Sequence, residues 1–164
     1  MRCLRPMLVC ALLLTCGCRS AGTAGLPPWQ MGKAVRISEV RGPLPGTKTV
    51  TMEIPRDRYI KALETGNVNT VRLVEVYSRY KVPETPPEYR LFDVRPGSVY
   101  DVLGLQTSDV ILAADGYVIP APQIFWQFLN LVRNLDKTSI ELVRGGRPIV
   151  FEYTLVPPVK PATS

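Results

Sequence analysis

Two cysteines separated by one glycine carry the most specific chemistry in this sequence. Cys16 and Cys18 follow a leader in which two arginines precede an apolar stretch over residues 7–14. That stretch is too short to span a bilayer as a helix, and small residues follow it, which is typical of an export signal. A lipoprotein signal ends at a cysteine whose sulfur accepts a diacylglyceryl group. Gly17 fits the cleavage position, so we expect lipidation at Cys18, with Cys16 as the weaker candidate.

All four cysteines lie within the first 18 residues, so cleavage at Cys18 would leave none in the folded part. That argues against structural disulfides and against thiol catalysis. Two or three acyl chains make a stable anchor, and we therefore expect a bacterial envelope protein that is lipid-anchored in the periplasm. An aspartate directly after the lipidated cysteine would favour retention in the inner membrane. This sequence has Arg19 there instead, and the absence of the aspartate favours the inner leaflet of the outer membrane. The alternative is an ordinary secretory signal with incidental cysteines.

The residues needed for most catalysis and metal binding are missing. The sequence contains no histidine, which removes the usual general base and the commonest metal ligand. No cysteine pair remains for zinc, and no Lys-Ser/Thr pair or helix follows Gly145-Gly146, so this pair predicts a turn rather than a phosphate loop. Asp109 and Asp115 bracket an expected strand, where turn and cap roles are the commoner explanation. We expect no enzymatic activity, no cofactor and no metal.

The charge pattern does not indicate a nucleic-acid surface. The formal charge of +6 arises from 20 lysines and arginines against 14 acidic residues. The basic residues are spread along the chain with no run of five or more, whereas nucleic-acid surfaces usually cluster them. We expect a solvated, mildly basic surface and no nucleic-acid partner.

Composition and patterning divide the chain into five parts. Glycine, proline and small residues mark the connections, and alternating or helical apolar spacing marks the folded segments. The expected parts are a lipoprotein signal peptide at 1–17, a flexible tether at 18–33, a strand–helix–strand extension at 34–88, a core at 89–155 and a disordered tail at 156–164.

The extension is predicted from three kinds of pattern. Ala34–Val40 and Thr47–Ile54 are predicted to be extended, the second because apolar and polar residues alternate along it. Pro55 is expected to open a helix over Arg56–Glu64, since a proline lacks the N–H that would be unpaired there anyway. Asn69–Tyr77 is rich in β-branched residues and is predicted to be a strand.

The core is predicted to contain four strands and two helices. The clearest helix has apolar residues at helical spacing, and two glycines join the last two strands as a hairpin. The expected strands are Tyr89–Arg95, Asp109–Ala113, Thr138–Arg144 and Arg147–Leu155, and the expected helices are Val99–Leu103 and Pro122–Leu135.

Three motifs in this core resemble a PDZ domain of the bacterial, circularly permuted kind. The motifs are Arg95-Pro96-Gly97-Ser98, Leu103-Gly104-Leu105-Gln106, and Ser108-Asp109-Val110-Ile111-Leu112-Ala113 with Asp115-Gly116. Ser108 departs from the glycine that the family usually has before the aspartate, and Asp115 departs from the usual asparagine. The resemblance implies an α+β fold, a PDZ-like partly open β-barrel or sandwich of five to six strands with one long and one short helix.

Within PDZ-like proteins, residues 49–155 are similar to protein C of the type II secretion system. That family places a strand, an Ile-Pro-Arg helix start and another strand ahead of the PDZ core. Thr49–Ile54, Pro55-Arg56 and Val71–Val76 match this order. Protein C is normally anchored by a transmembrane helix and carries a separate domain that contacts the outer-membrane secretin, whereas here we expect a lipid anchor and find little room for that domain.

The resemblance also implies a binding groove between the strand Tyr89–Val94 and the helix Pro122–Leu135. An extended partner segment would add a strand there. The expected wall residues are Leu91, Phe92, Ile124, Phe125 and Phe128, and the alternative for each is core packing. Capture of a terminal carboxylate is not expected, because Pro86-Pro87-Glu88 stands in place of the loop that performs it.

Three functions fit this resemblance. The first is a secretion-system module that binds exported proteins or machinery partners such as the secretin or pseudopilus. The second is a regulator or adaptor of a periplasmic protease. The third is a structural envelope lipoprotein whose groove is filled by its own residues.

Overall fold

The structure is a computed structural model that describes residues 34–65, 71–76 and 86–158. The predictions for the signal peptide, Cys16, Cys18 and the tether concern residues outside this part, as does the prediction for most of the tail. Within the described ranges, no helix is long and apolar enough to cross a membrane.

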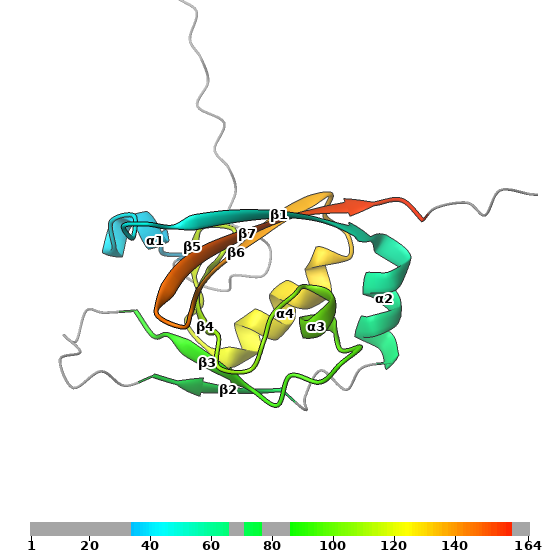
Figure 1. Cartoon of the computed structure of the whole chain (residues 1–164), viewed down its shortest axis with the longest axis horizontal. Helices are drawn as coiled ribbons and strands as arrows, with labels where there is room; N and C mark the ends of the chain where they lie inside the picture. Colours follow the sequence, from blue (N-terminus) through cyan, green and yellow to red (C-terminus); the bar gives the residue numbers. More distant parts are fainter. Residues whose placement is uncertain (1–33, 66–70, 77–85, 159–164) are drawn as a thin grey trace, which may run out of the picture.

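Seven strands form one mixed sheet (Figure 1). All neighbouring strands are antiparallel except β1 and β7, which are parallel over eight register positions. In sheet order the strands are β1 (Lys48–Pro55), β7 (Arg147–Val156), β6 (Lys137–Arg144), β4 (Val110–Ala114), β3 (Tyr89–Phe92) and β2 (Arg72–Glu75), and β5 (Tyr117–Val118) pairs with β4 off this path. The predicted extension supplies two of these strands, β1 and β2, and the predicted core supplies the other five, in agreement with the five to six expected.

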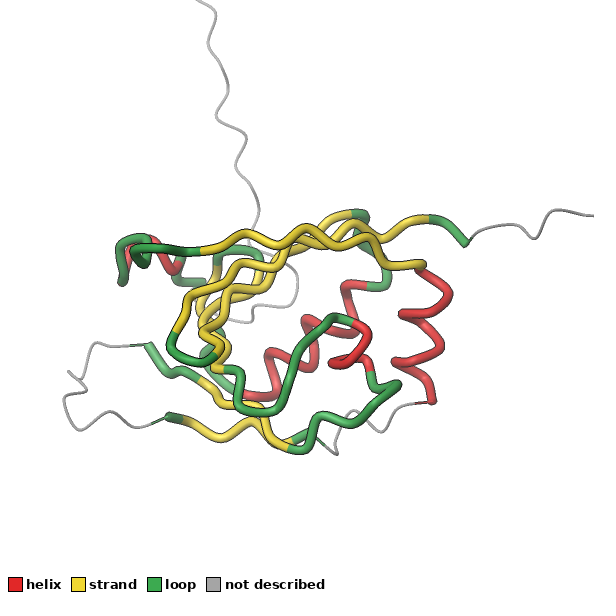
Figure 2. The backbone as a smooth tube through the Cα atoms, viewed as in Figure 1, coloured by secondary structure: helices red, strands yellow, loops and turns green. Residues whose placement is uncertain are grey.

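Four helices in the described ranges accompany the sheet: α1 (Ile37–Val40), α2 (Arg56–Thr65), α3 (Val99–Val102) and α4 (Pro122–Val132). Figure 2 shows α2, α3 and α4 below the upper band of strands, which curves toward β3 and β2. The core cluster contains buried residues from α4 together with residues of β3, β6 and β7. The fold is α+β with a mixed open sheet, as expected of a PDZ-like domain.

Two buried tyrosines fasten the helices to the rest of the core. The Tyr59 hydroxyl of α2 donates a hydrogen bond to the Leu129 carbonyl of α4 at 2.7 Å, and the Tyr153 hydroxyl of β7 donates to the Leu103 carbonyl at 2.9 Å. Burial raises the pKa of both phenols far above the usual value, so both hydroxyls remain donors.

Most of the predicted elements are confirmed, and their differences have local causes. β3 ends at Phe92 instead of Arg95, where Asp93 has a φ of 61° that interrupts a strand. α4 ends at Val132 instead of Leu135, because the last amides bond three residues back and tighten the turn. Gly145 and Gly146 have φ values of 55° and 77°, which confirms the predicted hairpin turn.

The first segment differs more. Ala34–Val40 was predicted to be extended, but only the beginning of it is, where Arg36 forms an isolated bridge to Tyr117. The Arg41 amide then donates to the Ile37 carbonyl at 2.8 Å and closes α1. The prediction is wrong for residues 37–40, and the segment instead leads into a loop over residues 41–47.

Candidate functional site

The strand β2 forms one end of the sheet. Among the described residues it pairs with β3 on one side and with no strand on the other. The Val76 amide donates to the Glu88 carbonyl at 2.8 Å, which fixes the bonding pattern of this antiparallel ladder. Since bonded and non-bonded pairs alternate, the N–H and C=O of Val74 point to β3 and those of Leu73 point away from it. An extended segment therefore has backbone groups to pair with on this edge.

Side chains along β2 alternate between the two faces of the sheet. Leu73 lies opposite Leu91 in the register, shares its face and packs half-buried against the core. Val74 points to the other face and is 48% exposed, an unusual exposure for a large apolar side chain in this molecule. Arg72 lies on that face as well, with its guanidinium 3.1 Å from the Asp93 carboxylate.

The helix α4 contributes two further half-buried apolar side chains. Ile124 and Leu131 are seven positions apart, so they lie on the same face of the helix, and both pack against the core cluster. The Tyr89 hydroxyl donates to the Pro120 carbonyl at 3.0 Å, which brings the start of β3 close to the residues that precede α4. Because Glu75 lies opposite Tyr89 in the register, the end of β2 is near the same place. Leu73, Ile124 and Leu131 are among the apolar side chains that remain partly exposed on these two elements.

The structure corrects the predicted groove residues. β3 is bonded to β2 on one edge and to β4 on the other, so Tyr89–Val94 has no edge to which a partner strand could add. Leu91, Phe125 and Phe128 are each 0% exposed, so their side chains are core residues and present no surface. The edge strand next to β3 is β2, which was predicted to belong to the extension.

The other two predicted wall residues, Ile124 and Phe92, are half-buried, and their side chains point in different directions. Ile124 is on α4 and remains available at the helix surface. Phe92 follows Leu91 on β3, so it points to the opposite face of the sheet from the buried core. The repeated β-branched residues of the segment 69–77 indicated a strand, but they carried no information on which strand would lie at the edge.

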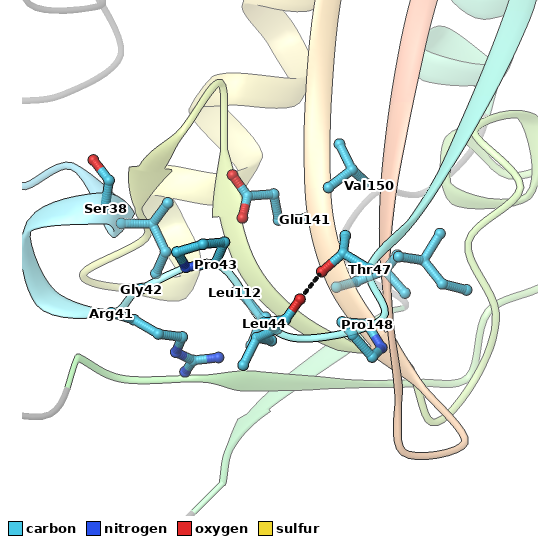
Figure 3. Close-up of a pocket in the computed structure, with 13 residues that line it drawn as sticks. Ser38, Arg41, Gly42, Pro43, Leu44, Thr47, Leu112, Glu141, Pro148 and Val150 are labelled. Atoms are coloured by element: carbon cyan, nitrogen blue, oxygen red, sulfur yellow. Dashed lines mark hydrogen bonds between the residues drawn. The ribbon is translucent and has the colours of Figure 1, made fainter.

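A cavity of about 310 Å³ lies elsewhere, between the segment 37–47 and the strands β4, β6 and β7 (Figure 3). Its walls are mostly apolar, and Arg41 and Glu141 are the two charged residues in its lining. Sequence patterns did not predict this cavity, because it forms only where residues 37–47 cross the strands of the sheet.

In the part of the chain that the structure describes, few other side chains are candidates for metal binding or catalysis. No group of three or more histidines, cysteines, aspartates or glutamates there could hold a metal ion. Asp109 is 1% exposed and forms an ion pair with Arg144, with an N–O distance of 2.7 Å. The Asp115 carboxylate accepts hydrogen bonds from the Thr138 hydroxyl and the Ser139 amide, both at 2.8 Å. Both aspartates have structural partners.

Comparison with known proteins gives similar structures only. No family model and no curated protein matches the chain. A PDZ domain of EpsC from Vibrio cholerae is 21% identical, with a TM-score of 0.37, over 60% of this chain and 96% of that one. The PDZ domain of the pullulanase C protein of the type II secretion system from Klebsiella pneumoniae, solved in complex with fatty acid, is 19% identical, with a TM-score of 0.31, over 58% and 98%. At these identities and TM-scores the likeness is a similarity only and carries no conclusion about function.

Proposed function

We propose that this chain is a periplasmic, membrane-anchored module that binds a segment of a partner protein by strand addition to β2. The observation that carries the proposal is the outer edge of β2, where the backbone groups of Leu73 point away from β3. Backbone pairing at such an edge gives affinity, and alternate side chains of the added strand give preference.

The half-buried residues Leu73, Ile124 and Leu131 support a preference for apolar side chains at alternate positions of the partner segment. Burying them further adds favourable apolar area on binding. A single short strand also loses conformational freedom when it docks, so the expected dissociation constant is on the order of micromolar. This is binding chemistry, and it needs neither a cofactor nor a metal.

The leader supports the location. An apolar stretch followed by Thr15-Cys16-Gly17-Cys18 favours lipidation at Cys18, and Arg19 after it favours anchoring in the inner leaflet of the outer membrane. The sequence motifs similar to type II secretion protein C support exported proteins, the secretin or pseudopilus components as the partner class.

The test is to crosslink the lipidated protein briefly in its own membranes, purify it and identify the proteins that come with it. Ile124→Glu places a charge on the half-buried face of α4 and is expected to abolish recovery of the specific partner. Gln127→Glu adds the same charge at an exposed position of the same helix and is the matched control. Recovery of secretion components by the wild type and by Gln127→Glu, but not by Ile124→Glu, supports the proposal. Equal recovery by all three contradicts it.

A further inference from the structure

The cavity beneath the segment 37–47 is separate from the edge of β2. Leu112 contributes to its wall and is 4% exposed, yet it is not part of the main core cluster. On β6, Ile140 and Leu142 belong to that cluster, so the side chain of Glu141 between them, which also lines the cavity, points to the opposite face of the sheet. The cavity therefore lies on the face of the sheet that is turned away from the core.

The segment that covers this face is fastened at both ends. At its start, the Ile37 amide donates to the Gly116 carbonyl and the Val118 amide donates to the Val35 carbonyl, both at 2.9 Å. At its end, β1 continues the segment into eight paired positions along β7. Between them, the Thr47 hydroxyl donates to the Leu44 carbonyl at 2.6 Å, as Figure 3 shows. The cavity is thus preformed and does not depend on a loose loop.

The apolar lining contains one carboxylate without a partner. No hydrogen bond or ion pair joins the Glu141 carboxylate to another residue within the described ranges. Burial raises its pKa above the usual value, while the positive charge of Arg41 opposes the shift. A carboxylate that loses water without gaining a partner is destabilised, so this site favours a ligand that supplies a donor or a positive charge.

Arg41, the second charged residue of the lining, does not supply this donor to Glu141. The Arg41 guanidinium donates to the Glu88 carboxylate and forms an ion pair with it. An anionic ligand would have to compete with Glu88 for Arg41, and Glu141 would repel it. The cavity therefore favours a ligand that carries a positive charge.

We propose that this cavity is a second binding site, which takes a small amphiphile with one ammonium group at Glu141 and an apolar body against Ile37, Leu44 and Leu112. The volume of about 310 Å³ is close to the lower end of the range for ligand pockets, roughly 300–1,000 Å³. The ligand is consequently small. The ammonium can belong to a free amine or to the amino terminus of a peptide that begins with an apolar residue.

The test uses hexylammonium as the probe and calorimetric titration of the full lipidated chain in bilayer nanodiscs, with empty nanodiscs as the blank. Saturable binding is expected, with affinity at least tenfold higher than for hexanol or hexanoate. Glu141→Gln is expected to reduce the affinity at least tenfold. Glu152→Gln, which removes a carboxylate from an exposed position of the neighbouring strand β7, is expected to leave it unchanged.

A second variant keeps the test independent of Glu141. Val150→Phe fills the cavity while the carboxylate stays in place, and it is expected to abolish binding. A peptide that begins with leucine, compared with its acetylated form, separates the two sources of the ammonium: binding lost on acetylation indicates a peptide terminus, and binding of hexylammonium alone indicates a free amine. The proposal is overturned if hexanoate or the acetylated peptide binds as tightly as its ammonium counterpart, if Glu141→Gln has no effect, or if hexylammonium does not bind.

Discussion

Asp109 holds the turn before β4 to the end of the neighbouring strand β6, where the last hairpin begins. Its carboxylate accepts a hydrogen bond from the Gln106 amide at 2.8 Å and two from the Arg144 guanidinium at 2.8 and 2.7 Å. Arg144 also donates to the Gly104 carbonyl, so three segments meet at one partly buried ion pair. The predicted turn role of Asp109 is therefore only part of its function in the fold.

Asp109→Asn is expected to lower the free energy of unfolding by about 1–3 kcal/mol. The physical reason is that it leaves the Arg144 charge without its buried partner. Urea denaturation followed by circular dichroism measures the change, with the exposed Glu53→Gln as a control that should stay within about 0.5 kcal/mol. A loss for Asp109→Asn no larger than that of the control would show that the pair does not stabilise the fold.

Ser108 adopts a backbone conformation that favours glycine. Its φ is 79°, and at this position the related PDZ motif usually has glycine. Left-handed backbone costs a residue with a side chain about 1–2 kcal/mol, while glycine loses about 0.5–1 kcal/mol more chain entropy on folding. Ser108→Gly is therefore expected to raise the free energy of unfolding, by about 1 kcal/mol at most. If chemical denaturation finds this variant less stable than the wild type, the serine side chain itself must stabilise the turn.

Glu141 makes stability depend on pH. Because its pKa is higher in the folded protein than in the unfolded chain, ionisation costs stability as the pH rises through the folded pKa. Below the free-glutamate pKa of about 4.3 both states are protonated and this cost is absent. Glu141→Gln should consequently be more stable than the wild type at pH 7, and the difference should vanish near pH 4. Thermal unfolding across this range measures it, and a difference that grows toward acid pH would contradict the assignment.

Local sequence patterns predicted the helices and strands more accurately than they predicted which of them lie side by side in the fold. Alternation around Val50, Met52 and Ile54 predicted β1, and the turn chemistry of Gly145-Gly146 predicted the last hairpin; both are confirmed. The candidate groove was misplaced because edge position is a property of the whole sheet. Leu91 and Phe125 have the residue types of a wall, but the strand order that buries them is set by contacts distant in sequence.

A pair of proline substitutions tests the assignment of β2 as the binding edge. Leu73→Pro removes an N–H that points away from β3, so the sheet should keep its bonds while partner recovery is lost. Val74→Pro removes an N–H that bonds to β3 and should destabilise the strand itself. The expected order is a smaller loss of unfolding free energy for Leu73→Pro than for Val74→Pro, measured by denaturation. The opposite order would mean that the bonding pattern of β2 is reversed.

The largest feature that sequence patterns did not reveal is the pairing of β1 with β7. The parallel ladder joins the beginning of the predicted extension to the end of the predicted core. Ile54 of β1 is 3% exposed and belongs to the same core cluster as Leu155, its partner in the register. The division into an extension at 34–88 and a core at 89–155 therefore follows sequence composition, whereas the packing joins both parts into one sheet.

Two internal deletions test this unity. A chain that lacks residues 34–47 loses the cover over Leu112 but keeps β1, so it should still unfold in one cooperative transition and lose only hexylammonium binding. A chain that lacks residues 34–55 exposes the outer edge of β7 along its length and removes Ile54 from the core. Buried apolar area and eight paired positions disappear together, and cooperative folding should be lost. Calorimetry distinguishes the two cases. If the longer deletion retained a cooperative transition of nearly full enthalpy, the chain from residue 56 onward would fold without β1, and β1 would be an accessory strand.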